Sequence, residues 1–252
     1  MVIEHPSPAR IGALRKLWST AFGDTEEFLD AFFGGAFAPE RCLCISEGET
    51  VAAALYWFDC LCEGRKLAYL YAVATHPDHR GKGLCRRLMA QTHAILARRD
   101  YAGTLLVPQD APLRKMYADM GYRECTRVRE EFCAAADEPV SIRRIVPEEY
   151  AALRSAYLST GGVVQEGENL RFLASMAELY AGEDFLLAAA EVENVLWGME
   201  LLGSRDAAPG ILKALGFGEG TFRMPGDEIP FAMYLPLSGD AAEPSYFGLA
   251  FD

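Results

Sequence analysis

Hydrophobic positions in the first 120 residues switch several times between the two-residue spacing of strands and the wider spacing of helices. Strand-like spacing covers residues 2–4, 41–46, 51–60, 67–75 and 103–107. Helical spacing covers residues 11–22, a segment capped by Asp24, residues 84–98 and a helix between residues 110 and 121. Strands and helices in this order predict an α/β (α+β) domain in which helices flank a mixed, mostly antiparallel sheet.

The strand-like run that ends at Thr75 leads into a turn flanked by glycines and then into a helix. The first turn of a helix leaves backbone N–H groups without intrahelical partners, at the positive end of the helix dipole. Gly81 and Gly83 permit unusual backbone dihedrals and the close approach of an anion. Positive side chains surround the turn, at Arg80, Lys82, Arg86 and Arg87. The segment indicates a site for a phosphorylated cofactor; an ordinary loop that caps a surface helix is the alternative.

Two common phosphate-binding motifs do not fit this turn. The NTPase pattern Gly-x-x-x-x-Gly-Lys-Ser/Thr fails because Gly83 follows Lys82. The dinucleotide pattern Gly-x-Gly-x-x-Gly fails because Arg86 stands at its third glycine.

A second informative segment, residues 103–122, reads as a short buried strand, a loop and a helix. Asp110 is a predicted N-cap, Pro112 suits the first turn, and Gly121 marks the end. One face of this helix is apolar, with Leu113, Met116, Tyr117 and Met120. From this pattern alone, Tyr117 is either a core residue or a functional one.

Together the two segments resemble the GNAT superfamily of N-acetyltransferases, from residue 1 to about residue 135. The family's acetyl-CoA motif, Arg/Gln-x-x-Gly-x-Gly/Ala, is matched by Arg80-x-x-Gly83-x-Cys85, with Cys85 as a departure. The later motif Leu-Tyr-x-x-x-Gly-Phe is matched by Met116-Tyr117-x-x-x-Gly121-Tyr122. Gln109 and Asp110 stand where many relatives have an asparagine.

The resemblance implies the GNAT fold and an N-acetyltransferase that uses acetyl-CoA as co-substrate. The pantetheine arm would lie along Val73, Ala74 and Thr75, and the diphosphate on the turn of Arg80, Gly81, Lys82, Gly83, Leu84 and Cys85. Tyr117 would be the general acid that protonates the departing thiolate, whose thiol has a pKa of about 8.5. A bound primary amine would attack directly; a thioester relay through Cys85 is the alternative.

The general base is left open, because neither residues 67–75 nor residues 103–107 contain the carboxylate that many relatives use. The candidates are Asp59, Tyr69, Tyr71, His76 and the carboxylate at Asp252. The last is included because larger tandem relatives of the enhanced-intracellular-survival type are thought to use a terminal carboxylate. The apolar segment 245–252 would otherwise be a strand that completes the sheet of the second half.

Beyond residue 140 the chain repeats short features of its beginning. Residues 152–160 echo residues 13–20, Phe172-Leu173 echoes Phe28-Leu29, and residues 206–217 echo residues 110–122. The second copy has no Arg-Gly-x-Gly turn, and Leu212 takes the place of Tyr117. We therefore expect a catalytic GNAT domain at residues 1–137 and a smaller, degenerate GNAT-like domain at residues 138–252.

Composition and charge narrow the function classes. Residues 1–137 hold 17 Lys and Arg against 18 Asp and Glu, and the rest hold 7 against 18, so the second half is strongly acidic. Such a half would repel nucleic acid and could concentrate a small cationic amine or a protein lysine. Seven cysteines without a Cys-x-x-Cys pair predict a reducing cytoplasm and no metal site.

No apolar run is long enough for a membrane span, and the sequence leaves a homo-oligomer open. A non-catalytic acetyl-CoA-binding or interaction protein, with its acceptor groove blocked by the second half, is the alternative to an enzyme.

Overall fold

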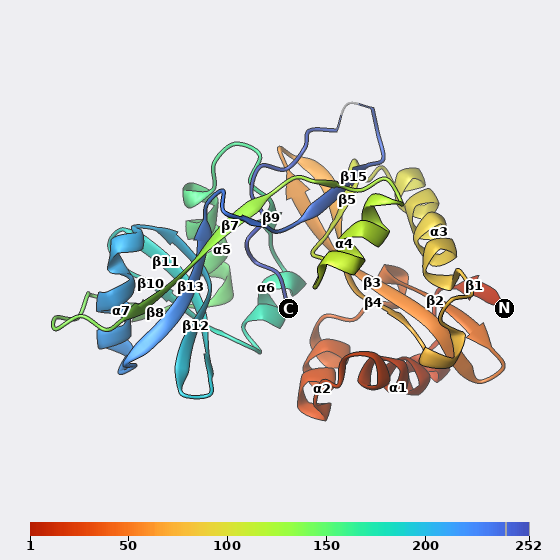
Figure 1. Ribbon diagram of the computed structural model, residues 1–252, viewed down its shortest axis with the longest axis horizontal. Helices are drawn as coiled ribbons and strands as arrows, with labels where there is room; N and C mark the ends of the chain where they lie inside the picture. The colour runs from red at the N-terminus through yellow and green to blue at the C-terminus, as the bar shows by residue number, and fades with distance from the viewer. Residues whose placement is uncertain (240, 252) are drawn as a thin grey trace.

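The computed structural model describes residues 1–239 and 241–251 and contains two β-sheets with helices around them (Figure 1). The elements up to residue 137 are β1 (Val2–Glu4), η1 (Pro8–Arg10), α1 (Ile11–Phe22), α2 (Glu26–Gly35), η2 (Pro39–Arg41), β2 (Cys42–Glu47), β3 (Thr50–Cys62), β4 (Arg65–Thr75), η3 (Pro77–His79), α3 (Leu84–Arg98), β5 (Gly103–Leu106), α4 (Ala111–Ala118), β6 (Arg123–Glu124) and β7 (Arg127–Ala134). Those beyond it are β8 (Arg143–Arg144), α5 (Pro147–Tyr157), β9 (Val164–Gln165), α6 (Glu168–Leu173), β10 (Glu178–Ala181), β11 (Phe185–Val192), β12 (Val195–Gly203), η4 (Arg205–Ala207), α7 (Ala208–Leu215), β13 (Glu219–Pro225), β14 (Ile229–Pro230) and β15 (Met233–Pro236).

The helices of the first half begin where capping chemistry predicts, with one correction. Asp110 caps α4, since its carboxylate accepts a hydrogen bond from the Leu113 amide at 2.7 Å. The predicted cap at Asp24 is wrong: Thr25 caps α2, and Asp24 accepts a hydrogen bond from the Trp18 indole at 2.7 Å instead. The N-cap and the residue before it are both good acceptors, so sequence alone does not separate them.

The strand orders of the two sheets correspond to each other, and strands are exchanged between the halves: the first sheet takes β15 and β9 from the second half, and the second sheet takes β7 from the first half. The first runs β1-β2-β3-β4-β5-β15-β6, with β9 paired to the far end of β3. The second runs β8-β10-β11-β12-β13-β7-β14. Thus β15 lies between β5 and β6, while β7 lies between β13 and β14. The predicted boundary at residue 137 stays a prediction, because strands cross it in both directions.

The topology also changes how the internal repeat is read. Helix α7 connects the parallel neighbours β12 and β13, just as α3 connects the parallel neighbours β4 and β5. The alignment of residues 206–217 with residues 110–122, which set Leu212 against Tyr117, is therefore wrong in three dimensions. α7 takes the place of α3, and the described part of the second half contains no counterpart of α4.

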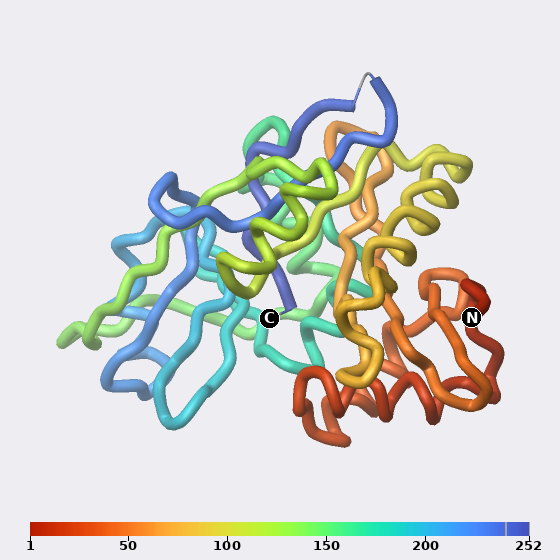
Figure 2. The backbone as a smooth tube through the Cα atoms, turned by 45° about the vertical axis from the view of Figure 1, so that its right-hand side comes forward, coloured from red at the N-terminus to blue at the C-terminus, as the bar shows by residue number. Residues whose placement is uncertain are grey.

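Three hydrophobic cores lie between the sheets and the helices of the described residues. One lies between the first sheet and α3 and α4, and another between the second sheet and α7. The third lies between the two halves: α1, α2, α5, α6 and residues 246–251 pack there against the facing sides of both sheets. Figure 2 shows the last described residues running between the halves, as does Figure 1. This shared core makes the halves one packed body.

Candidate active site

Strand β4 separates from its neighbour β5 halfway along. The two pair in parallel only from Leu67 to Tyr69, opposite Gly103 to Leu105. On its other side β4 has a bulge against β3, where Ala72 takes a left-handed φ of 46°. The bulge turns the end of β4, and its edge from Ala72 to Thr75 is paired with no strand on the β5 side in the described chain. Val73, Ala74 and Thr75 lie on this open edge.

The turn after β4 aims backbone amides at one place. Gly81 and Gly83 have φ angles of 74° and 71°, which L side chains rarely adopt, and the space in front of both is open. Gly83 is the N-cap of the fifteen-residue helix α3. Within residues 1–239 and 241–251, no group accepts a hydrogen bond from the amides of Gly81 to Arg86. These donors and the helix dipole are suited to an anion.

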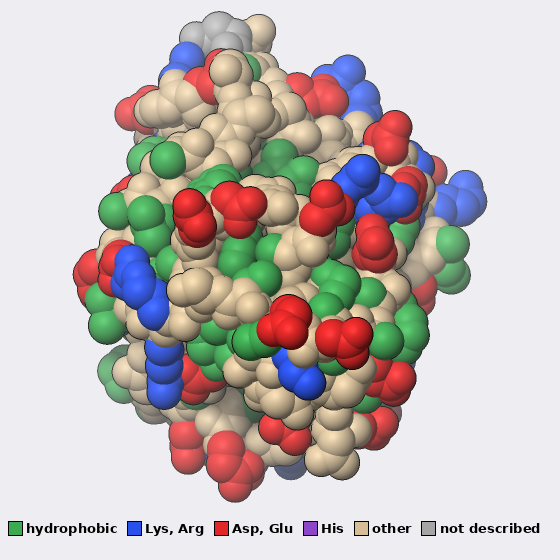
Figure 3. All heavy atoms as spheres, turned by 90° about the vertical axis from the view of Figure 1, so that its left-hand side faces the viewer, with side chains coloured by type: hydrophobic (Ala, Val, Ile, Leu, Met, Phe, Trp, Pro, Cys, Tyr) green, Lys and Arg blue, Asp and Glu red, His purple; other side chains and the backbone are tan. Residues whose placement is uncertain are grey.

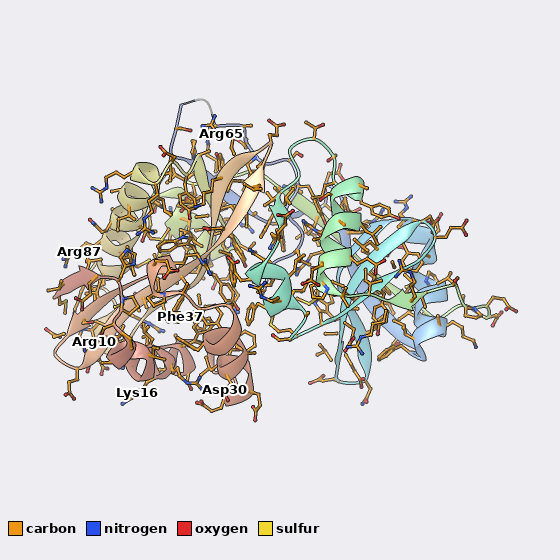
Figure 4. All side chains as sticks on the ribbon, turned by 180° about the vertical axis from the view of Figure 1, so that it is seen from behind. Arg10, Lys16, Asp30, Phe37, Arg65 and Arg87 are labelled. Carbon is orange, nitrogen blue, oxygen red and sulfur yellow. The ribbon has the colours of Figure 1, made fainter. Side chains whose placement is uncertain are left out.

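Basic side chains around the turn are exposed. The Arg80 Nε donates to the Thr75 carbonyl at 3.3 Å and ties the turn to the end of β4. Arg86 donates to the Asp119 carbonyl, the residue that ends α4, at 3.1 Å. Arg87 lies in the same first turn of α3, on the outside of the first half and away from the second half (Figure 4). The turn is thus anchored on both sides and keeps its positive charge.

Tyr117 lies beside this turn. Its side chain is buried at 6 % exposure, and it belongs to one packed cluster with Val73, Leu84 and Cys85. Burial raises the pKa of the Tyr117 phenol, so the hydroxyl keeps its proton. The structure therefore brings the β4 edge, the α3 turn and Tyr117 together in one cluster.

Cys85 is half-buried, and burial raises the pKa of its thiol. A thiol that holds its proton is a weak nucleophile. This chemistry argues against a covalent relay at the start of α3.

The candidate bases lie at different places. Asp59 is on the α3 side of the sheet, where its carboxylate accepts a hydrogen bond from Tyr101 and lies 3.6 Å from the Lys66 Nζ. The His76 Nδ1 accepts a hydrogen bond from the Asp78 amide at 3.3 Å and caps η3, beyond the end of β4. Asp252 lies outside the described residues.

Tyr69 and Tyr71 lie on the opposite side of the sheet from Asp59, in the shared core. The Phe251 amide donates to the Tyr69 hydroxyl at 3.4 Å, and the Phe251 ring lies 5.9 Å from the Tyr71 ring. The expected strand at residues 245–252 is wrong for the described part, because a bridge between Gly162 and Tyr246 is its only strand-like pairing.

The second half contributes aromatic residues that the sequence did not point to. Phe172 of α6 lies 5.6 Å from Phe28 and 6.2 Å from Tyr71, measured between ring centroids. The echo between Phe172-Leu173 and Phe28-Leu29 marked α6 as a repeat of α2, but no local pattern indicated that the two helices pack together. The side of β4 that carries Tyr71 is thus lined by aromatic residues of both halves.

No group of three or more His, Cys, Asp or Glu side chains in residues 1–239 and 241–251 could hold a metal ion. In the same residues, every helix is too short or too polar to cross a membrane.

Comparison with known proteins finds a family match for the first half of the chain. Residues 3–125 match the profile of the family described as "Acetyltransferase (GNAT) domain". A search of curated proteins finds no match.

Solved structures share the fold over nearly the whole chain. An N-acetyltransferase related to GCN5 from Anabaena variabilis has a TM-score of 0.74 at 15 % identity, covering 94 % of this chain and 73 % of that one. One from Kribbella flavida has a TM-score of 0.71 at 17 % identity, covering 95 % and 73 %. A tandem GNAT protein from the clavulanic acid biosynthesis pathway has a TM-score of 0.57 at 13 % identity, covering 94 % and 98 %. Residues 3–125 thus match the GNAT family, whose acetyltransferases use acetyl-CoA, and the solved structures show that the fold is shared over nearly the whole chain.

Proposed function

We propose that this protein transfers an acetyl group from acetyl-CoA to the primary amine of a small cationic molecule by direct attack. The observation that carries the proposal is the set of free amides from Gly81 to Arg86, next to a cluster that contains Val73 and Tyr117. Amide donors with nearby guanidinium groups fit a diphosphate, and an open strand edge fits an amide-bearing arm. Acetyl-CoA contains a diphosphate, an amide-bearing pantetheine arm and an activated acyl group.

Each proposed residue then has a defined task. The amides of the α3 turn and Arg80 hold the diphosphate, and the edge from Val73 to Thr75 holds the pantetheine arm. A main-chain N–H on this edge stabilises the negative charge that develops on the thioester oxygen. Tyr117, kept protonated by burial, donates its proton to the departing sulfur.

The amine approaches from the side of β4 that carries Tyr69 and Tyr71. Aromatic rings line this side, and the faces of half-buried Phe28, Phe33 and Tyr71 attract cations. The second half has an excess of acidic side chains, many of them on its outer face (Figure 3), and this negative charge raises the local concentration of a cationic acceptor. Of the candidate bases in the described residues, Tyr69 and Tyr71 lie on this side, whereas Asp59 is held by Tyr101 on the other. The acceptor's proton would leave through one of these hydroxyls and water.

A non-catalytic acetyl-CoA-binding protein is the second candidate. It is favoured by Phe172 and Phe251, which fill much of the acceptor side with rings 5.3 Å apart. In that case the anion site would bind acetyl-CoA without transfer.

Replacement of Tyr117 by Phe separates the two functions. The test measures free-thiol release from acetyl-CoA with spermidine, glucosamine and lysine amide, and acetyl-CoA affinity by calorimetry. An enzyme should lose about 100-fold or more in turnover, because general acids contribute about 10²–10⁴. Acetyl-CoA affinity should stay within about threefold.

Tyr122→Phe is the matched control. The Tyr122 ring lies 5.8 Å from that of Tyr117, but its hydroxyl is within hydrogen-bond distance of His93 and Thr104 instead. This variant should keep its turnover. Equal turnover of wild type and Tyr117→Phe would refute the acid role, and acetyl-CoA binding with no amine-dependent thiol release would favour the second candidate.

A further inference from the structure

A fully buried ion pair lies in the second half, outside the proposed acetyl-CoA site. Arg154 of α5 donates from Nε and Nη2 to the two Glu200 oxygens of β12 at 2.7 and 2.9 Å. The two residues are 1 % and 0 % exposed. Two phenols complete the set, since Tyr150 donates to Glu200 at 3.0 Å and Tyr246 at 3.1 Å. The Glu200 carboxylate is thus surrounded by four donated hydrogen bonds.

Such a cluster calls for a reason other than stability. A buried ion pair has little advantage over apolar residues of the same size, since removing two charges from water offsets their attraction. What it does provide is geometry, because a bidentate guanidinium–carboxylate pair admits one arrangement. The question is which part of the molecule this arrangement holds in place.

The cluster holds the tail, which we define as residues 241–251. Beyond the Tyr246 hydroxyl, the tail is bound by backbone hydrogen bonds to the loop before β9: Ser245 donates to Gly161 at 2.9 Å, and Val163 donates to Tyr246 at 2.8 Å. Arg154 fixes the same loop by donating from Nη1 to the Val163 carbonyl at 2.9 Å. The ion pair therefore contacts both the tail, through Tyr246, and the loop to which the tail is bound, through Val163.

Gly248 makes the tail fit closely over this anchor. A Cβ at this position would lie 2.0 Å from the Tyr246 hydroxyl and 3.2 Å from the Glu200 Oε1. The chain turns back over the phenol at a distance that only glycine allows. The Tyr246 hydroxyl thus donates a hydrogen bond to Glu200 and is closely covered by the backbone of Gly248.

Past this turn the tail enters the core between the halves. Phe247, Leu249 and Ala250 are fully buried, and Gln165 donates to the Leu249 carbonyl at 3.0 Å. Phe251, 4 % exposed, ends against the acceptor side of the first sheet, with its ring 4.9 Å from Phe58 and 5.8 Å from Tyr69. Phe251 lies five positions after the anchored Tyr246.

We propose that Tyr246, fixed by the Arg154–Glu200 pair, is a positioning residue for acetyl transfer, because it holds the tail so that Phe251 forms one wall of the acceptor site. The inference rests on the proposed function, because the proposed function places the amine on the side of β4 that carries Tyr69. It makes the second half part of the catalytic unit, even though its own helix α7 carries no anion turn.

The test compares Tyr246→Phe with Tyr150→Phe as its matched control. Both substitutions remove one phenol hydroxyl that donates to Glu200, at 3.1 and 3.0 Å, and only Tyr246 belongs to the tail. Hydrogen–deuterium exchange of peptides covering residues 241–251 measures tail order. Thiol release with the best amine of the panel above measures the KM of the amine and kcat, and calorimetry measures acetyl-CoA affinity.

In Tyr246→Phe we expect tail amides to exchange at least tenfold faster, and the KM of the amine to rise at least fivefold with acetyl-CoA affinity within twofold. Tyr150→Phe should change all three less than twofold. Equal effects of both variants would overturn the proposal, as would faster exchange with an unchanged KM. If the wild type acetylates no amine while only Tyr246→Phe frees the tail, the proposed function fails and the anchor alone is upheld.

Discussion

Removal of the buried negative charge at Glu200 should destabilise the whole protein. In Glu200→Gln, the Arg154 guanidinium stays buried at 1 % exposure and loses its counter-charge. Burial by itself lowers the pKa of Arg154, but the charge of Glu200 and its hydrogen bonds outweigh this and raise it. In the variant the charge of Glu200 is gone, but an arginine guanidinium is not deprotonated in proteins, so the variant contains an unpaired buried cation.

The expected loss is about 3–5 kcal/mol of unfolding free energy, the usual cost of breaking a buried pair from one side. For a chain of this length, about 2–4 °C per kcal/mol converts this to about 6–20 °C in Tm. Because one core is shared by both halves, we expect a single unfolding transition. The loss is a large part of a typical stability of about 5–15 kcal/mol.

Urea unfolding followed by circular dichroism measures the effect, with Glu149→Gln as the matched control. Glu149 also pairs with an arginine, Arg143 at 2.5 Å, but on the surface of the same half. Water already solvates both of these charges, so this control should unfold like the wild type.

The double variant Arg154→Met/Glu200→Gln tests the physical reason. It contains no buried charge, so it should lose much less stability than the two single variants added together. Additive effects, or a Glu200→Gln variant that unfolds like the control, would refute the argument that charge pairing dominates this site.

Two further predictions concern acid stability and the domain boundary. Burial lowers the pKa of His93 to about 4, below its unfolded value of about 6.5, so the unfolded chain binds more protons between these values and stability falls as pH drops through that window. Urea unfolding at pH 7 and pH 5 should show about 2 kcal/mol of loss that His93→Gln lacks, and equal losses in both proteins would exclude His93 as the cause. A chain that ends at residue 137 lacks β15, so β5 and β6 lose the strand between them and β7 has no sheet. Size exclusion and thermal denaturation should find no cooperatively folded monomer, whereas a sharp transition in a monomer would uphold two independent domains.

Local chemistry made part of the molecule predictable from the sequence. The bounds of α1 and α3 follow from apolar spacing over short segments, and the α4 cap follows from Asp110 three residues before the amide it accepts. The left-handed turns at Gly81 and Gly83 follow from glycine's missing side chain. These features depend on residues a few positions apart, and a pattern can express them.

For Tyr117, the expectation that it lies near the Gly81–Gly83 turn came only from a resemblance to known motifs. An apolar helical face predicts burial, and burial is what the structure has, at 6 % exposure. Whether a buried phenol neighbours Val73 and Cys85 depends on how α4 packs on the sheet, which no spacing within α4 expresses.

The amino-acid sequence by itself determined most strands and helices of the first 118 residues, the glycine-flanked turn and the acidic character of the second half, because each depends on neighbouring residues or on composition. Tertiary structure alone decided that β7 and β15 exchange sheets, that Asp59 faces away from Tyr69, and that Phe251 packs beside Tyr69. An alternating strand pattern fits either sheet equally well, so the choice falls to contacts between residues 85 or more positions apart.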